Sequence, residues 1–169
     1  MLLVVVALAA GTAAGLLLGG RVRHLAATRL RSVGLLLGGA VCEFAGNQWG
    51  AGAVGTGIIV AGYGLLLAFA VRNAAITGMV LVAVGLLANA LVIAIDDGMP
   101  VRGAPAGATF GARHHGERPG DHLTGLADVV RAPLIGETVS AGDLVLSLGV
   151  ATVVVSLLRP PRRRLALNR

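Results

Sequence analysis

The chain contains no lysine, few acidic residues, few aromatic residues and a single cysteine. Its 14 lysine-plus-arginine positions are all arginine and only eight residues are acidic, so the formal net charge is +6. The lone Cys42 excludes an intramolecular disulfide. Nucleic-acid binding, which a basic chain could suggest, is disfavoured because almost no aromatic side chains lie among the arginines to stack on bases.

Short motifs of known chemistry are also absent. The sequence has no phosphate-binding loop, dinucleotide-binding fingerprint, nucleophilic-serine elbow or zinc-binding helix motif. We therefore expect no cofactor, and the sequence favours a non-enzymatic protein over an enzyme.

The chain consists mainly of long apolar segments. Of its 169 residues 56% are hydrophobic and 13% are charged, and the mean hydropathy is +0.84. A chain this short cannot bury about four helices that are apolar on all sides, because a small domain still exposes much of its surface. Lipid is therefore expected to cover these helices.

Five apolar segments approach the length of about 20 residues that a helix needs to cross a bilayer. The expected spans are residues 2–19, 32–49, 52–71, 74–95 and 139–158, and a long polar segment, residues 96–138, separates the last two. The expected fold class is all-α: a bundle of five transmembrane helices in one domain, residues 1–169, with one long extracytoplasmic loop.

Charges of opposite sign alternate along the chain. Ten arginines lie at residues 21–31, at Arg72 and at residues 159–169, whereas seven of the eight acidic residues lie between Arg72 and the last of these sites. Cytoplasmic loops are enriched in arginine and lysine, so the N-terminus is predicted to be extracytoplasmic and the C-terminus cytoplasmic. The arginine loops are expected to contact anionic lipid headgroups.

Glycines repeat at helical spacing in the first two expected spans. Gly11, Gly15 and Gly19 recur every four residues, and Gly34 and Gly38 repeat that spacing. Such stripes let helices approach closely. We favour contacts between neighbouring helices of one chain, and the alternative is a homodimer or another membrane-protein partner.

Glu43 stands alone inside an apolar run. It lies 12 residues after Arg31, which places it about 18 Å into a core of about 30 Å. A carboxyl group at that depth must be protonated, paired or exposed to a polar cavity. By the same count Asn89 lies in the same outer half, where the two side chains could form a hydrogen bond. We interpret Glu43 as a neutral, hydrogen-bonded packing residue; the alternative is a small-solute or ion site at Glu43 and Asn89.

The expected extracytoplasmic segment contains weaker patterns. His114, His115 and His122 are residue types that bind zinc, but this stretch, rich in glycine and proline, predicts little local order, so we assign no metal site. Apolar residues at helical spacing within residues 123–130 predict a short helix lying on the outer leaflet, and the alternative is a loop docked on the bundle.

Asp143 has two interpretations. With Ser140 it has the spacing of a helix capping box, and an acidic residue is favoured in the first turn of a helix. Alternatively, Asp96 or Asp97 and Asp143 could share a proton as a catalytic dyad at the outer face. The tracts "GLLANALVIAIDD" and "SAGDLVLSLG" resemble the lipoprotein signal peptidases, which implies a membrane-embedded aspartic hydrolase or peptidase. This chain lacks the Phe-Asn that precedes the final Ala-Asp motif in that family. The family's aspartate also lies closer along the sequence to its asparagine than Asp96 lies to Asn89.

A second resemblance covers most of the chain. The tracts "LANALVIAIDDGMPV", "DHLTGLADVVRAPLIGETV" and "SAGDLVLSLG" resemble an uncharacterised family of small bacterial multi-pass proteins, a domain of unknown function common in actinobacteria. Asn89 and residues 98–101 match part of its pattern, which is Asn, an apolar run and Gly-x-Met-Pro-Val. The family tends to carry Asn-Gly where this chain has Asp96 and Asp97, which argues against a required dyad. The resemblance implies five spans and a bacterial plasma membrane. We therefore expect an accessory or structural membrane protein of unknown activity.

Overall fold

The computed structural model describes residues 2–49, 52–103, 113–128, 130–132 and 137–160. The described chain is mostly helical, which confirms the predominantly helical class. In chain order its helices are α1 (Leu2–Leu17), the 3-10 helix η1 (Val22–Ala27), α2 (Val33–Gln48), α3 (Ala53–Arg72), α4 (Met79–Ile95) and α5 (Ala141–Leu158). Four arginines of the expected basic C-terminal segment lie outside the described residues: Arg162, Arg163, Arg164 and Arg169.

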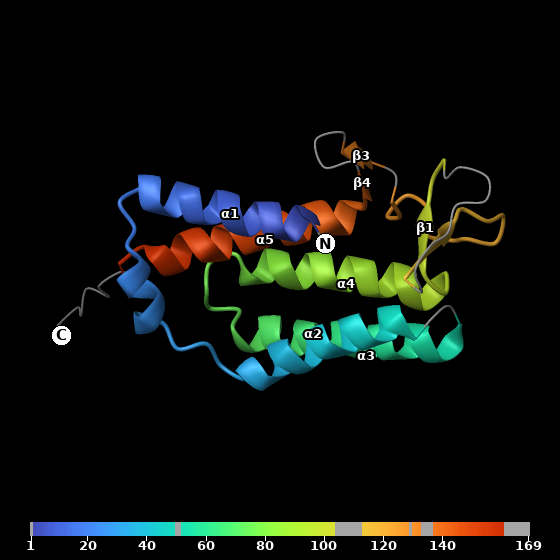
Figure 1. Ribbon diagram of the computed structural model, residues 1–169, viewed down its shortest axis with the longest axis horizontal. Coiled ribbons are helices and arrows are strands. Elements are labelled where there is room, and N and C mark those ends of the chain that lie inside the picture. The colour runs from blue at the N-terminus through green and yellow to red at the C-terminus, as the bar shows by residue number, and fades with distance from the viewer. Residues whose placement is uncertain (1, 50–51, 104–112, 129, 133–136, 161–169) are drawn as a thin grey trace, which may run out of the picture.

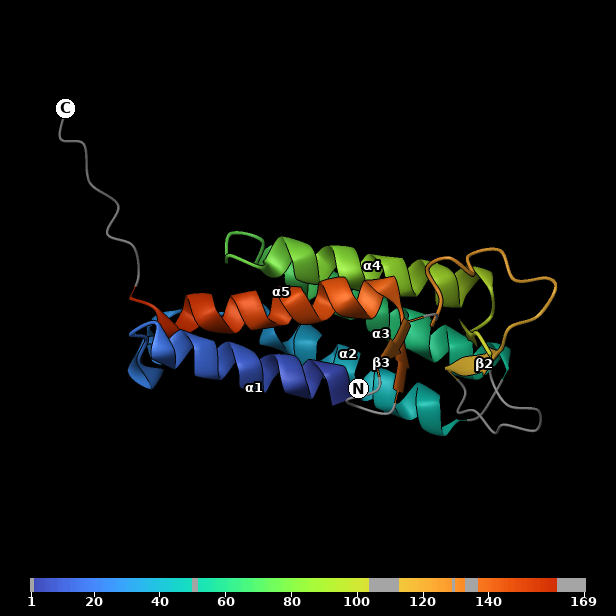
Figure 2. The same cartoon turned by 90° about the horizontal axis from the view of Figure 1, so that it is seen from above.

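The five α-helices lie side by side (Figures 1 and 2). α1 packs on α5, α5 on α4, α4 on α3, and α3 on α2. The last helix in the sequence therefore lies between the first and the fourth. The arginine-bearing connections, η1 and the turn between α3 and α4, lie at one end of the bundle, and the short strands lie at the opposite end (Figure 1).

Two helices begin two or more residues later than the predicted spans. α4 begins at Met79 because residues 74–78 form turns, and Gly78 has a φ of +100°, a left-handed conformation that favours glycine. α5 begins at Ala141 because Val139 ends a strand and Ser140 caps the helix. Hydrophobicity alone does not mark these starts, since the turn residues before Met79 are themselves largely apolar.

Glycines let the helices approach until their backbones touch. A Cβ atom at Gly11 of α1 would lie 2.7 Å from the carbonyl oxygen of Ala151 on α5. One at Gly85 of α4 would lie 2.5 Å from the backbone nitrogen of Leu146, also on α5. Such contacts provide the van der Waals attraction that holds apolar helices together. Within this chain, the glycine-bearing faces of α1 and α4 are used for contact with α5.

The predicted stripes match this packing only in part. Nothing lies within 4 Å of a Cβ built at Gly19 or Gly34, which belong to the two predicted stripes. On α2 the tight contacts with α3 come from Gly39 and Gly46, so the repeat of Gly34 and Gly38 does not mark the packing face. Adjacent glycines at positions 38 and 39 make the face ambiguous in the sequence, and the position of α3 decides it.

The outward faces of the helices are apolar. Val41 and Phe44 on α2 are 65% and 71% exposed, and further exposed large apolar side chains lie on α1, α3, α4 and α5. In contrast, Asn89 and Ser140 are fully buried between helices. A protein surrounded by water has the reverse tendency, because its polar side chains are mostly exposed and its apolar ones mostly buried. By length and composition, α3 and α5 could each cross a membrane, and α1 and α4 are shorter apolar helices.

Asn73 ties together the arginine-bearing end. Its side-chain oxygen accepts a hydrogen bond from the backbone N–H of Arg31 at 2.8 Å, and its Nδ2 donates to the carbonyl oxygens of Arg31 and Phe69. Arg72 donates to the Ser32 hydroxyl at 3.0 Å. The connection leading into α2 is thereby fastened to the end of α3.

Short strands replace part of the predicted loop. β1 (Met99–Val101) pairs in parallel with β2 (His114–Gly116), and β3 (Val130–Ala132) pairs antiparallel with β4 (Glu137–Val139). The predicted short helix within residues 123–130 is wrong. Residues 124–126 form a turn, and the backbone of Asp128 bonds to Pro100 and Arg102 beside β1. These nonlocal hydrogen bonds outcompete the local helical pattern.

Replacing Gly85 with alanine should weaken the bundle. The added methyl group would meet the backbone of α5, and we expect the free energy of unfolding to fall by about 1–3 kcal/mol, the usual cost of overpacking. The measurement is unfolding of the purified protein in detergent micelles, followed by circular dichroism.

Gly57→Ala is the matched control, because nothing lies within 4 Å of a Cβ at this position of α3. It should leave stability unchanged or raise it by up to about 1 kcal/mol through helix propensity. Equal unfolding of the two variants would contradict the packing assigned to Gly85.

Candidate functional site

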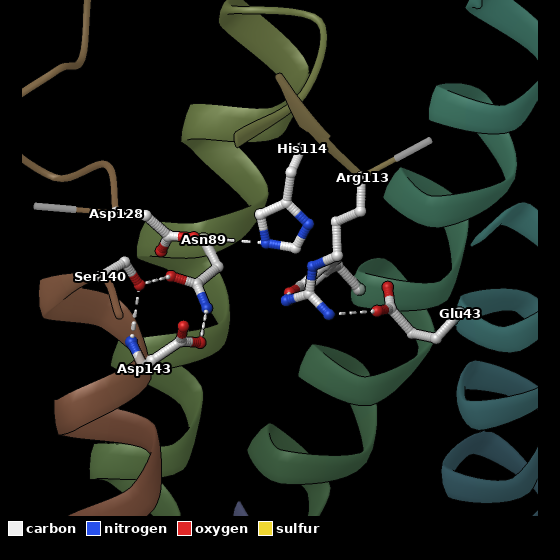
Figure 3. Close-up of polar contacts among 8 residues, drawn as sticks. Glu43, Asn89, Arg113, His114, Asp128, Ser140 and Asp143 are labelled. Carbon is white, nitrogen blue, oxygen red and sulfur yellow. Dashed lines mark hydrogen bonds and ion pairs between the residues drawn. The ribbon is translucent and has the colours of Figure 1, made fainter. Parts of the chain in front are cut away.

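Polar side chains gather at the end of the bundle where the strands lie (Figure 3). Four helices and the segment between α4 and α5 contribute to this polar cluster. Its members are Glu43 on α2, Tyr63 on α3, Asn89 on α4, Ser140 and Asp143 at the start of α5, and Arg113, His114 and Asp128 from the connecting segment. The apolar helices thus converge on a set of charged and hydrogen-bonding groups.

Arg113 reaches from the connecting segment toward α2 and α3. Its Nη1 donates to Oε2 of Glu43 at 3.2 Å, and its Nη2 donates to the Tyr63 hydroxyl. Its guanidinium carbon lies 5.2 Å from the centroid of the Tyr63 ring. The side chains of Arg113 and Glu43 are 20% and 18% exposed, so the ion pair is largely shielded from solvent. One ion pair stacked on an aromatic ring joins the loop to the bundle.

The pKa of Arg113 is raised above its ordinary value. Burial alone lowers the pKa of a guanidinium, but electrostatic attraction to neighbouring groups outweighs burial here. Those groups are Tyr63, Glu43, Asp143 and Asp128. Arg113 therefore remains a cation throughout the physiological range of pH.

Asn89 joins α4 to the first turn of α5. Its Nδ2 donates to Oδ1 of Asp143 at 2.7 Å, and its Oδ1 accepts from the Ser140 hydroxyl at 3.0 Å. The Ser140 oxygen in turn accepts from the backbone N–H of Asp143 at 2.9 Å. This last bond confirms the predicted helix cap. Fully buried Asn89 therefore has both ends of its amide engaged.

His114 and Asp128 form a third contact in the cluster. Nε2 of His114 lies 3.3 Å from Oδ2 of Asp128, whose side chain is 5% exposed. The other carboxylate oxygen of Asp128 is buried and has no hydrogen-bond partner within the described residues, and the same holds for Oε1 of Glu43 and Nε of Arg113. The cluster thus retains unused acceptors and one unused donor.

The candidate ligand residues Glu43 and Asn89 both lie in this cluster, although no hydrogen bond between them is found in the described part of the chain. Glu43 pairs with Arg113, whereas Asn89 bonds to Ser140 and Asp143. Of the alternatives predicted for Glu43, the structure shows pairing, and because the partner is the cation Arg113, the interpretation of Glu43 as a neutral packing residue is not supported. The two residues belong to adjoining parts of one site.

Two of the three candidate aspartates, Asp96 and Asp143, are engaged in other hydrogen bonds. Asp96 is buried, and its carboxylate accepts the backbone N–H groups of His122 and Leu123 at 2.8 and 3.0 Å. Asp97 is exposed at the turn after α4 and has a φ of +50°. No hydrogen bond or ion pair joins either residue to Asp143 among residues 2–49, 52–103, 113–128, 130–132 and 137–160. Asp96 holds the loop, and Asp143 serves the start of α5.

Two of the three candidate histidines lie against Asp96, because Nδ1 of His122 is 3.5 Å from its Oδ1 and His115 contacts its carbonyl oxygen. His114 pairs with Asp128, and His115 is buried with its Nε2 3.0 Å from the carbonyl oxygen of Asp96. The His122 side chain is 76% exposed. No group of three or more histidine, cysteine, aspartate or glutamate side chains suited to a metal ion occurs within the described residues.

Sequence reasoning does not identify Arg113 or Tyr63 as members of the site. The signal was indirect, since a lone carboxylate within an apolar helix needs a cationic or hydrogen-bonding partner. Four arginines lie on the predicted outer side, and the linear sequence does not distinguish which of them returns to Glu43. Folding of the connecting segment makes that selection.

Fold and site together define a mostly helical protein in which four helices and a connecting segment meet in a polar cluster. A family model described as "Family of unknown function (DUF5317)" matches residues 24–155, a range that includes every member of the cluster. The chain belongs to this family, which confirms the resemblance to a domain of unknown function. No curated protein and no solved structure matches the chain.

Replacing Asn89 with alanine should destabilise the site end of the bundle. The Ser140 hydroxyl and the Asp143 carboxylate would lose buried partners, and each such loss costs about 1–3 kcal/mol. We expect a lower free energy of unfolding in detergent micelles, measured by circular dichroism.

Asn47→Ala is the control, because Asn47 is an exposed asparagine near the same end of the bundle. Its unfolding should match that of the unmodified chain. If Asn89→Ala were as stable as Asn47→Ala, the hydrogen bonds of Asn89 would contribute nothing to the fold.

Proposed function

We propose that this chain is a multi-pass protein of the bacterial plasma membrane, with five spans, an extracytoplasmic N-terminus and a cytoplasmic C-terminus. Its role is that of an accessory or structural component whose outer segment closes the mouth of its own bundle. The observation that carries the membrane setting is the apolar outward face of the helices around buried polar groups. Exposing such a large apolar surface to water is unfavourable, whereas contact with the apolar tails of lipids is not.

Helix length and charge placement support the same proposal. The five α-helices have 16 to 20 residues, which corresponds to about 24–30 Å against a hydrocarbon core of about 30 Å. The arginine-bearing connection, residues 21–31, and the end of α3 that carries Arg72 lie at the end opposite the strands (Figure 1). Arginine enrichment at one end supports a cytoplasmic location for that end and contact with anionic headgroups.

The contacts of the outer segment support a structural role over a hydrolytic one. Arg113 ties this segment to α2, and Asp96 binds its backbone. Asp143 is hydrogen-bonded to Asn89 and starts α5. A hydrolytic dyad needs two carboxyl groups close enough to share a proton. Asp96 and Asp143, two of the three aspartates considered for that chemistry, instead hold the outer segment and the start of α5.

Cysteine labelling tests the topology. In a Cys42→Ala background, Val22→Cys introduces a thiol into the arginine-bearing connection and Gly120→Cys introduces one into the outer segment; both positions are exposed. In intact cells a membrane-impermeant maleimide should react with the Gly120→Cys variant, and the Val22→Cys variant should react only after the membrane is opened.

Two controls accompany this measurement. The Cys42→Ala chain without a new cysteine sets the background, and alkaline carbonate should leave every variant in the membrane pellet. Labelling of the Val22→Cys variant in intact cells would show that the arginine-bearing connection is outside, which contradicts the proposed topology. Release of the protein by carbonate would contradict the membrane setting.

A further inference from the structure

We infer that the outer end of the bundle is a binding site for guanidinium groups, which the chain fills with its own Arg113. The cage consists of the Glu43 carboxylate and the Tyr63 ring. The occupying cation is Arg113 of the connecting segment, which Figure 3 shows beside Glu43. This inference concerns a ligand and does not depend on the direction in which the helices cross a membrane.

The groups that contact Arg113 are those that recognise a guanidinium in general. A carboxylate accepts its N–H groups with charge assistance, and the face of an aromatic ring attracts the cation. Here Glu43 supplies the carboxylate at 3.2 Å, and Tyr63 supplies both a ring 5.2 Å away and a hydroxyl acceptor. A cation is therefore recognised by three different features of two side chains.

The cage belongs to the helices and not to the loop. A Cβ at Gly62, next to Tyr63, would lie 3.1 Å from the backbone nitrogen of Glu43, so α2 and α3 are in close contact beside the two cage residues. Arg113 directly precedes β2 and comes from a different part of the chain. The cage is thus held by helix packing whether or not Arg113 occupies it.

Arg113 leaves part of the site unused. It contacts Glu43 through one hydrogen bond, whereas a guanidinium and a carboxylate can form two parallel ones. Oε1 of Glu43 and Oδ1 of Asp128 are buried without partners among the described residues, and the Asp128 side chain is only 5% exposed. A guanidinium ligand that is not attached to this chain can rotate so that it donates a second hydrogen bond to Oε1 of Glu43.

The charge around the cage favours a cation over an anion. Glu43, Asp128 and Asp143 all lie near enough to Arg113 to interact with its charge, and His114 is the other basic group in the cluster. Removing Arg113 leaves an excess of carboxylates in a shielded place, which is costly without a replacement cation. Arg113 therefore competes with any guanidinium ligand for the cage. When a ligand displaces Arg113, the ion pair that holds the connecting segment to α2 is lost.

The single tyrosine provides a direct test. Tyr63 is the only tyrosine in the chain, so ¹³C-labelling of tyrosine gives the ring signal of the cage alone. In the full-length protein in detergent micelles, methylguanidinium should shift this signal saturably in the Arg113→Ala variant. If Arg113 fills the cage about nine-tenths of the time, the unmodified chain should bind methylguanidinium about tenfold more weakly.

Matched variants and probes make the result specific. Arg118→Ala removes an exposed arginine from the same segment and should behave like the unmodified chain. Adding Glu43→Gln to Arg113→Ala should abolish the shift, and sodium chloride at equal concentration should not produce it. A blocked Gly-Arg-Gly peptide distinguishes the sources of the ligand. Binding of the peptide indicates an arginine of a partner protein, and binding of methylguanidinium alone indicates a small molecule.

Stability gives a second readout in case Arg113→Ala folds poorly. Methylguanidinium should then raise its unfolding temperature more than sodium chloride does, and the effect on Arg118→Ala at the same concentration should be smaller. Absence of both a saturable tyrosine shift and this rescue would overturn the inference, as would binding that persists after Glu43→Gln.

Discussion

Close contact between helix backbones is the constraint on which the rest of the structure depends. The helices are apolar on their outward faces as well as their inner ones, so a difference in polarity contributes little to their association in the proposed lipid setting. Glycines at the α1–α5, α4–α5 and α2–α3 contacts remove the side chains that would separate the backbones. Dispersion forces over these short distances then hold the bundle in one arrangement.

The polar cluster follows from that packing. Because α4 and α5 touch at Gly85, Asn89 lies one turn further along α4, opposite the start of α5, where it reaches Ser140 and Asp143. Because α2 and α3 touch at Gly62, Glu43 and Tyr63 are both within reach of Arg113. The outer segment is then fastened to the bundle by Arg113 and folded onto Asp96. In the proposed membrane setting, these contacts close the end of the bundle that faces away from the cytoplasm.

Local patterns predicted the helices well and the connecting segment poorly. Long apolar runs located all five α-helices, and the Ser140–Asp143 spacing identified a real cap. The apolar spacing within residues 123–130 predicted a helix that does not form, because pairing with distant strands supplies other hydrogen bonds. The predicted span 74–95 begins before α4, because the largely apolar residues 74–78 form turns ending at Gly78. Family membership was also readable, from tracts around Asn89 and the start of α5.

The sequence by itself determined which segments are helical, that their surfaces are apolar and that the arginines and the acids gather at different places. These properties reside in composition and in spacing along one element, where each residue contributes independently. Only the tertiary structure decided which glycines contact a neighbouring helix and which arginine pairs with Glu43. It also decided that the hydrogen-bond partner of Asp143 is Asn89. Such choices join residues dozens of positions apart, and their energies depend on how the helices pack, which no local pattern records.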